Sequence, residues 1–257
     1  MFPKGLEGSE KVTHRLVLPA MAAMENMSLW LDAADADTLR CSPVNAARTS
    51  NPNQARRPRH VNVWHDKSSC RHNASAYSAR DDSLQIKPPT MDGHTINGLG
   101  TVRFERGASM RGSEGKYKTI AMVMQWASNP RACDMIFSAW QDQDFSIRFG
   151  DGMPGFRRGR ADGNDWEHGH GNKLWVNGSS TDRVWEGFPD APGVIVGVKR
   201  DGRFDKGFTY QLSSTFMGRG MDAWVGEIIG FDRELDEGEA KEVGAYLGAK
   251  WGVDMKQ

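Results

Sequence analysis

Three carboxylates near the C-terminal end of the chain have the spacing of a hydrolytic site. Glu234, Asp236 and Glu239 form an E-x-D-x-x-E pattern. On a strand, alternate side chains point to one face, where two carboxylates can flank a glycosidic bond as acid and nucleophile. If this segment is a strand, it therefore favours a carbohydrate-active enzyme.

The residues that follow the pattern favour a helix instead. One apolar face is formed by Ala240, Val243, Leu247 and Trp251, which recur at helical spacing. Asp236 then occupies the N-cap, with Glu239 three residues later as in a capping box. Glu237 and Glu239 also suit the positive end of the helix dipole. We interpret the pattern as a helix cap and predict no catalytic residue in the chain.

A glycine-rich loop at residues 150–172 is the leading candidate for a metal site. It contains several oxygen-bearing side chains, of which Asp162, Asn164, Asp165 and Glu167 are the candidate ligands. Carboxylate and amide oxygens are the ligands that Ca²⁺ prefers. His168 and His170 are two ligands only, too few for a transition metal. The alternative is a solvated loop of glycine and charged residues, with no metal.

The same region has residues that could contact a ligand. Trp166 and Trp185 could stack on a sugar ring, although buried or interface tryptophans are more common. Arg157, Arg158 and His168 could bind polar groups of a glycan or of an acidic partner. Functional residues favour loops held by a rigid scaffold, so we expect these five residues at the binding site. The alternative is again a solvated loop.

Composition excludes some classes of protein. Lys and Arg together number 33 of 257 residues, as do Asp and Glu, so the basic excess of a nucleic-acid-binding protein is absent. No apolar run approaches the roughly 20 residues of a membrane-spanning helix, and acidic residues before Leu16–Met24 do not fit a signal peptide. Cys41, Cys70 and Cys133 allow either one disulfide with a free thiol or three reduced thiols.

The chain pattern predicts an all-β fold with one C-terminal helix. About eleven short apolar or alternating runs are separated by turn residues, which is typical of a sandwich or barrel. They lie at 28–32, 61–65, 84–86, 101–105, 118–126, 134–140, 145–149, 173–177, 193–199, 208–212 and 223–232. The run 118–126 is apolar on both faces, and 134–140 with 145–149 predicts a hairpin. Residues 40–60 are interpreted as a long loop, 1–27 as an N-terminal arm, and 28–257 as one domain.

Five fragments, in this order, carry a family resemblance. They are Leu29-Trp-Leu-Asp-Ala33, Val63-Trp-His-Asp-Lys-Ser68 with His72-Asn-Ala74, Asn97-Gly-Leu-Gly-Thr-Val-Arg-Phe104, Gly226-Glu-Ile-Ile-Gly-Phe-Asp232 and Tyr246-Leu-Gly-Ala-Lys-Trp-Gly252. Together they resemble concanavalin A-like lectin/glucanase domains of the laminin-G-like type. The resemblance spans about residues 28–253. It implies a jelly roll of two antiparallel sheets, and such relatives often bind calcium at the rim.

The resemblance implies fold more than function, because one fold hosts unrelated activities. We expect a non-enzymatic recognition module that binds a glycan or a protein surface through its rim loops, with Ca²⁺ as the candidate cofactor. One alternative is a structural subunit of a virion or membrane-associated complex, assembled through residues 1–27. The other is a carbohydrate-active enzyme. An extracellular site, a virion surface and a large complex all stay open as locations.

One polar motif within the second fragment has two interpretations. Asp66, Lys67, Ser68 and Asn73 recur in the family, which suggests a functional role. Asp and Ser side chains also bond to nearby backbone groups and stabilise tight turns. We favour the turn interpretation.

Overall fold

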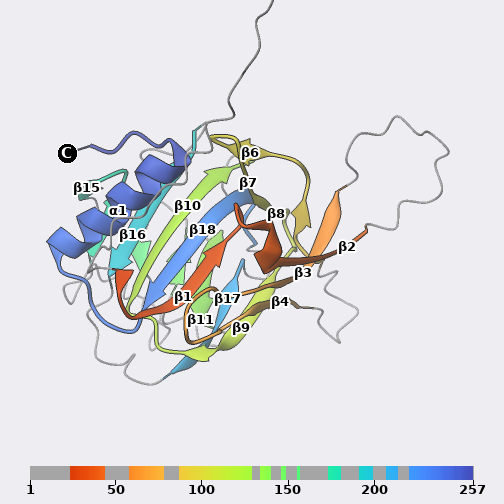
Figure 1. The fold of residues 1–257 in the computed structure, drawn as a ribbon, viewed down its shortest axis with the longest axis horizontal. Coiled ribbons are helices and arrows are strands. Elements are labelled where there is room, and N and C mark those ends of the chain that lie inside the picture. The colour runs from red at the N-terminus through yellow and green to blue at the C-terminus, as the bar shows by residue number, and fades with distance from the viewer. Residues whose placement is uncertain are drawn as a thin grey trace, which may run out of the picture.

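The protein is mostly antiparallel β-structure with one α-helix at the C-terminal end of the described chain (Figure 1). The computed structural model describes residues 24–43, 58–77, 87–128, 134–139, 146–148, 155–156, 173–180, 191–198, 207–213 and 220–256. This architecture confirms the predicted all-β class and C-terminal helix. Across these ranges, no helix has the length and apolar character needed to cross a membrane.

The strands pair into one long antiparallel series and one separate hairpin. In the first part of the chain they are β1 (Met27–Asp32), β2 (Leu39–Pro43), β3 (Arg59–Trp64), β4 (Ala74–Ala76), β5 (Thr90–Met91), β6 (Thr95–Ile96), β7 (Leu99–Gly100), β8 (Val102–Phe104) and β9 (Met110–Gly115). The later strands are β10 (Thr119–Trp126), β11 (Met135–Ala139), β12 (Ser146–Arg148), β13 (Gly155–Phe156), β14 (Lys173–Val176), β15 (Ser179–Ser180), β16 (Gly193–Val198), β17 (Phe208–Leu212) and β18 (Ala223–Phe231). A short 3₁₀ helix, η2 (Ala36–Thr38), follows β1.

Most of the predicted strands are confirmed, and the errors fall where the sequence is polar. The hairpin prediction is confirmed, because β11 pairs with β12. The long loop predicted at 40–60 is wrong at both ends, since β2 runs through residue 43 and β3 begins at residue 59. The sequence pattern does not predict β2, β4, β5, β6, β7, β9, β13 or β15. The predicted strand 84–86 lies outside the described residues.

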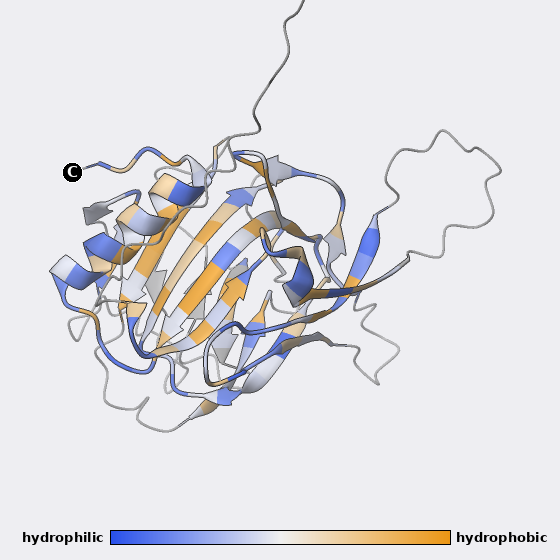
Figure 2. Ribbon diagram, viewed as in Figure 1, coloured by the Kyte–Doolittle hydropathy of each residue, from blue (hydrophilic) through white to orange (hydrophobic). Residues whose placement is uncertain are grey.

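Two apolar clusters lie on opposite faces of β10 and β18, which gives the fold its β-sandwich character. On β10, Ile120, Met122 and Met124 join one cluster, while Ala121 and Val123 join the other. This alternation confirms that the strand is buried on both faces. The first cluster also contains residues of β9, β11 and β17, and the second contains the apolar face of the helix. Figure 2 shows the hydrophobic bands along β10 and β18.

The helix α1 (Glu237–Trp251) begins at the predicted cap. Asp236 accepts a hydrogen bond from the backbone N–H of Glu239, and the Glu239 side chain accepts one from the N–H of Asp236. Arg233 also forms an ion pair with Glu239 at 2.7 Å. The capping box is thus confirmed, together with burial of all four residues on the predicted helix face: Ala240, Val243, Leu247 and Trp251. Glu234, Asp236 and Glu239 belong to a helix start rather than to a strand.

The cap provides a test of this local assignment. Asp236→Ala removes the acceptor for an otherwise unbonded helix N–H, so we expect the free energy of unfolding to fall by about 1 kcal/mol. Urea denaturation followed by circular dichroism measures this loss. Asp254→Ala, at another exposed acidic position, is the control and should change stability little. Equal stability of the two variants would contradict a stabilising role for the capping box.

Candidate functional site

A bulge in β18 places an acidic residue beneath the helix. In the pairing with β10, Met124 lies opposite Val225 and Val123 lies opposite Glu227, so one extra residue, Gly226, is inserted. Such a bulge turns two consecutive residues to the same face. A Cβ on Gly226 would lie 2.8 Å from the ring of Trp251, and Glu227 bonds to the same indole. The bulge therefore directs both positions toward α1.

Glu227 is a fully buried carboxylate with four hydrogen-bond donors. One oxygen accepts from Nε1 of Trp30 at 2.7 Å and from the hydroxyl of Tyr246 at 3.0 Å. The other accepts from Nζ of Lys250 at 2.6 Å and from Nε1 of Trp251 at 2.8 Å. The side chain is 0% exposed. A buried charge is tolerated only when it is paired and hydrogen-bonded, and Glu227 meets both conditions.

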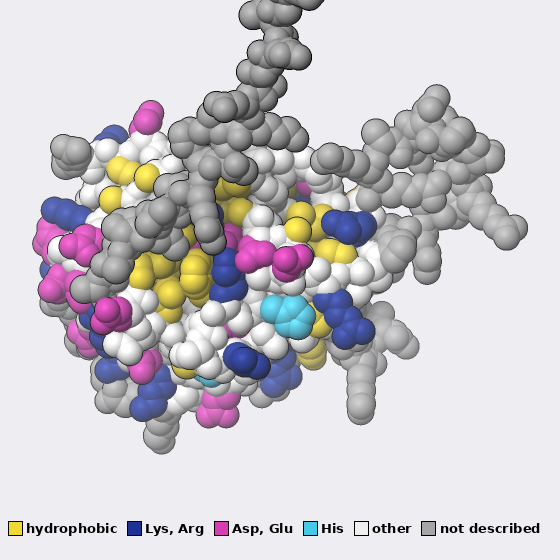
Figure 3. Space-filling view, in the orientation of Figure 1, with side chains coloured by type: hydrophobic (Ala, Val, Ile, Leu, Met, Phe, Trp, Pro, Cys, Tyr) yellow, Lys and Arg dark blue, Asp and Glu magenta, His cyan; other side chains and the backbone are white. Residues whose placement is uncertain are grey.

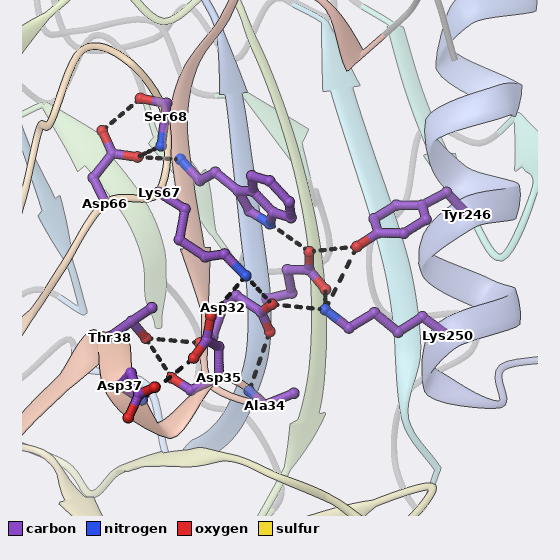
Figure 4. A network of polar contacts seen from close by, with 12 residues as sticks. Asp32, Ala34, Asp35, Asp37, Thr38, Asp66, Lys67, Ser68, Tyr246 and Lys250 are labelled. Atoms are coloured by element: carbon purple, nitrogen blue, oxygen red, sulfur yellow. Dashed lines mark hydrogen bonds and ion pairs between the residues drawn. The ribbon is translucent and has the colours of Figure 1, made fainter. Parts of the chain in front are cut away.

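Asp32 extends this network toward the surface (Figure 4). It forms ion pairs with Lys250 at 2.9 Å and with Lys67 at 3.0 Å, and Lys67 also pairs with Asp35 at 2.9 Å. Burial of Lys67 disfavours its charge, but hydrogen bonds to Asp35 and Asp32 outweigh this, so the pKa of Lys67 is raised. The bond from Lys67 holds the pKa of Asp35 below its usual value. The charges therefore alternate in sign along the series Glu227, Lys250, Asp32, Lys67 and Asp35.

Asp66 joins the second sequence fragment to the first. Its carboxylate accepts hydrogen bonds from the hydroxyl and N–H of Ser68, from the N–H of His72 and from the N–H of Trp30. Its own N–H donates to the side chain of Asn73 at 2.9 Å. The turn interpretation is confirmed, and the bond to Trp30 adds a link between two segments 36 residues apart. The neighbouring Lys67 lies 4.4 Å from the centroid of the Trp30 ring.

The central carboxylates of the network are shielded from solvent. The side chain of Asp32 is 5% exposed and that of Glu227 is fully buried, whereas those of Lys67 and Asp35 are 27% and 36% exposed. Among the described residues of the network, Lys67 and Asp35 are the more exposed, and Lys250 is 12% exposed. On the face shown in Figure 3, acidic and basic side chains adjoin a hydrophobic patch near the middle of the view.

A second group of polar residues forms a row across six neighbouring strands. Strand register places Ser42 opposite His60, His60 opposite Thr90, Thr90 opposite Arg103, Arg103 opposite Trp224, and Trp224 opposite Gln125. Directly paired residues share one face of a sheet. Their sequence neighbours Val61, Val102, Val225 and Met124 belong to the internal cluster, so the row lies on the opposite, outer face. We call these six half-buried residues the outer strip.

Trp224 is the most strongly held member of the outer strip. The ring of His94 stacks on the indole with centroids 3.9 Å apart, and the Arg103 guanidinium lies 4.8 Å from the indole centroid. The indole N–H donates to Asp92 at 2.9 Å. His94 Nε2 also lies within hydrogen-bond distance, 3.2 Å, of the Gln125 side-chain oxygen. These contacts fix one partly exposed aromatic ring among polar groups.

Charge beside Trp224 is compensated. Arg103 forms a short ion pair with Asp222, which also pairs with Arg106 at 3.2 Å. Burial of Asp222 favours the neutral acid, but hydrogen bonds from Ser128 and Arg103 outweigh it and lower the pKa of Asp222. Asp92 lies 4.0 Å from Arg103 on its other side. Because each guanidinium has a carboxylate partner, the strip favours an uncharged ligand over an anion.

The site residues expected from the sequence lie elsewhere in the chain. The candidate ligand-binding residues Trp166, Trp185, Arg157, Arg158 and His168 all fall outside the described residues, as do the candidate calcium ligands Asp162, Asn164, Asp165 and Glu167. Within the described ranges, no group of three or more His, Cys, Asp or Glu side chains is arranged to hold a metal. Cys41 and Cys70 are free thiols, and Cys133 is outside the described residues.

Local sequence patterns identify Asp66 and Lys67 but assign no role to Glu227, Asp92, His94 or Trp224. Asp92 and His94 were interpreted as loop, and Trp224 as a strand residue without a role. A signal is present in the turn sequence Asp92-Gly-His94, where the Asp92 side chain accepts a hydrogen bond from the N–H of His94 and Gly93 has a positive φ. Their contact with Trp224 depends on pairings between segments more than 100 residues apart, such as Trp224 with Asp92.

Replacing the central carboxylate tests the buried network. In Glu227→Gln, either orientation of the amide turns its NH₂ toward two donors, while Lys250 loses a buried partner. We expect a loss of about 3–5 kcal/mol in the free energy of unfolding. Glu237→Gln, which removes a charge from the exposed Glu237–Lys241 pair, is the matched control and should change little. If Glu227→Gln were as stable as this control, the network would not hold the fold as described.

Acid should weaken the fold through carboxylates whose pKa values are lowered. Asp35 and Asp222 both titrate below the ordinary value of 3.8 in the folded protein. Their contribution to stability is therefore complete above that value and is lost as the pH falls through the folded pKa. We expect the free energy of unfolding, measured in urea, to decline below about pH 5. Asp222→Asn should flatten this decline, and an unchanged slope would exclude Asp222 as a contributor.

The chain has no match among known protein families: no family model matches it, and no curated protein matches it either. The resemblance to concanavalin A-like domains therefore remains an expectation based on the five sequence fragments. The contacts of the described residues, above all those around Trp224, are the basis on which a function can be proposed.

Proposed function

We propose that this protein is a non-enzymatic recognition module that binds an uncharged carbohydrate at the outer strip. The observation that carries the proposal is the fixed, partly exposed indole of Trp224 among hydrogen-bonding side chains. His94 stacks on the indole and Arg103 lies over it, so a sugar would pack its apolar C–H groups on the exposed edge of this cluster and bond its hydroxyls to the planar polar groups. Arg103, Gln125 and Asp92 supply such groups beside the indole. Binding to a protein surface is the competing outcome.

Preorganisation supports this assignment. His94 stacks on the indole, Arg103 lies over it and Asp92 accepts from its N–H, so little side-chain freedom remains to be lost on binding. Ordering a mobile side chain at an interface costs roughly 0.5–1.5 kcal/mol. A ligand that packs against the exposed edge of this preformed cluster avoids most of this cost. Binding can therefore be strong even when the contact area is small.

We also propose that the strands form the two-sheet jelly roll that the resemblance implies. The internal cluster joins β1, β10 and β18 to β9, β11 and β17, as the core between two packed sheets would. All five fragments that resemble the family contribute residues to the buried network or its immediate neighbours. These residues are Trp30, Asp32, Asp66, Asn97, Glu227 and Lys250. Asn97 is included because its side-chain amide donates to the carbonyl of Lys250 at 3.0 Å.

A glycan array probed with the native chain and Trp224→Ala tests the function. We expect retention of at least one uncharged glycan by the native chain and a loss of about tenfold in affinity for Trp224→Ala, equivalent to about 1.4 kcal/mol. Lys116→Ala changes an exposed residue just before β10, at the opposite end of that strand from Gln125, and should bind normally. Matching thermal melts of the variants exclude unfolding as the cause.

The array is run with and without Ca²⁺, because the candidate ligands Asp162, Asn164, Asp165 and Glu167 remain a prediction. A calcium requirement would favour the loop site over the outer strip. No binding under either condition would overturn the carbohydrate proposal. Equal binding by the native chain and Trp224→Ala would place the site elsewhere.

A further inference from the structure

We propose that the edge strand β2 docks an extended segment of another protein in which apolar and acidic residues alternate. The segment would lie beside β2 and extend the sheet by one strand, a mode of recognition in which backbone hydrogen bonds provide affinity and side chains provide specificity. The inference goes beyond the proposed carbohydrate site and does not depend on it, because it rests on the edge of β2 and on the charge around that edge.

Strand β2 has an open edge within the part of the chain that the structure describes. Its five residues, Leu39–Pro43, pair with β3, which is the only strand partner of β2 among the described residues. Backbone N–H and C=O groups on such an edge have no partner in the sheet, so they can pair with another chain. In Figure 1, β2 lies at the right of the view, on the side of the molecule away from α1. An added strand would therefore reach this edge without displacing the helix.

The side chains of β2 alternate between an apolar face and a polar face. Leu39 and Cys41 pack against the internal cluster, yet both are only half-buried. Arg40 and Ser42 lie on the opposite face of the strand, and Arg40 is exposed. Residues directly opposite each other on neighbouring strands share a face and contact each other. A strand that fits this edge is therefore apolar beside Leu39 and Cys41 and polar beside Arg40.

The charge around β2 is positive. Residues 38–65 contain five arginines and no Asp or Glu, although the whole chain carries no net charge. Arg40 on β2 and Arg59 on β3 are both exposed, and neither has an ion-pair partner among the residues described. Arg59 lies opposite Pro43, at the end of the same pair of strands. Unpaired charge on a docking surface favours a partner of opposite charge, so the polar positions of the added strand should be acidic.

The same charge disfavours a second copy of the chain as the occupant. Two β2 strands paired edge to edge along their length would place the Arg40 side chains of the two copies at opposite or diagonal positions on one face. Like charges in such positions destabilise a sheet. A charged side chain and a terminal proline, here Arg40 and Pro43, are features that protect sheet edges from self-association. A carboxylate beside Arg40 converts this repulsion into attraction, which commits the edge to an acidic partner.

Fluorescence anisotropy with short labelled peptides tests the inference on the native chain. The probe is a capped peptide with the core Val-Glu-Val-Glu-Val. Three comparison peptides carry Lys in place of Glu, the same residues in the order Glu-Glu-Val-Val-Val, or N-methyl groups on every backbone nitrogen of the core, which remove the N–H groups needed for strand pairing. We expect the alternating Glu peptide to bind about tenfold more tightly than each of the other three.

Charge reversal on the strand gives the matching test on the protein. Arg40→Glu should weaken binding of the alternating Glu peptide about tenfold and strengthen that of the Lys peptide by a similar factor. Lys116→Glu makes the same reversal at an exposed position outside β2 and should bind both peptides as the native chain does. The N-methylated peptide tests strand pairing without altering the protein, so a folding defect in Arg40→Glu does not prevent the test.

Several outcomes would overturn the inference. Equal binding of the peptide with grouped Glu residues, or of the N-methylated peptide, would show charge attraction without strand pairing. Binding of a short single-stranded DNA that Arg40→Glu abolishes, with no binding of the Glu peptide, would assign the basic edge to nucleic acid. A dimer in analytical ultracentrifugation whose stability changes in Arg40→Glu would assign the edge to a second copy. Absence of binding by all four peptides would exclude docking of this kind.

Discussion

The arrangement of the helix against the sheet depends on the buried carboxylate of Glu227. Removing a carboxylate from water costs several kcal/mol, and only good geometry with full hydrogen bonding offsets that cost. Its four donors come from β1 and α1, through Trp30, Tyr246, Lys250 and Trp251. If α1 shifted by one turn, three of the four bonds would be lost together. The charge therefore selects one docking position, which apolar packing alone would specify less sharply.

The bulge at Gly226 makes this interaction sterically possible. Without the extra residue, strand alternation would turn position 227 to the internal cluster. With the bulge in place, any side chain larger than that of glycine at position 226 would collide with Trp251. A glycine with no Cβ lets the indole approach the strand, and its Nε1 then reaches Glu227. The cost of a glycine in a strand interior is modest, on the order of 0.5–1 kcal/mol. The approach it permits completes the shell of donors.

Local patterns in the sequence were sufficient for some of these features and not for others. The capping box and the buried strand β10 could be predicted, because each depends on residues a few positions apart. Neither the buried network nor the outer strip could be, since their bonds join segments far apart, such as Trp30 and Glu227 at a separation of 197 residues. Without the pairing register of the strands, the sequence shows Glu227 only as one polar residue in an apolar strand. The same is true of Arg103 on β8.

The buried network and the proposed binding site share a single strand, β18. On β18, Glu227, Ile229 and Phe231 face the helix. Trp224, three residues before Glu227, lies beside the polar side chains of β8 and β10. The bulge between them lets both residues lie on the outer face despite their odd separation. Since Glu227 and its partners stabilise this part of β18, Trp224 projects from a rigid backbone. A binding residue on such a strand is positioned before the ligand arrives, which is the physical advantage of a site on a strand over one on a loop.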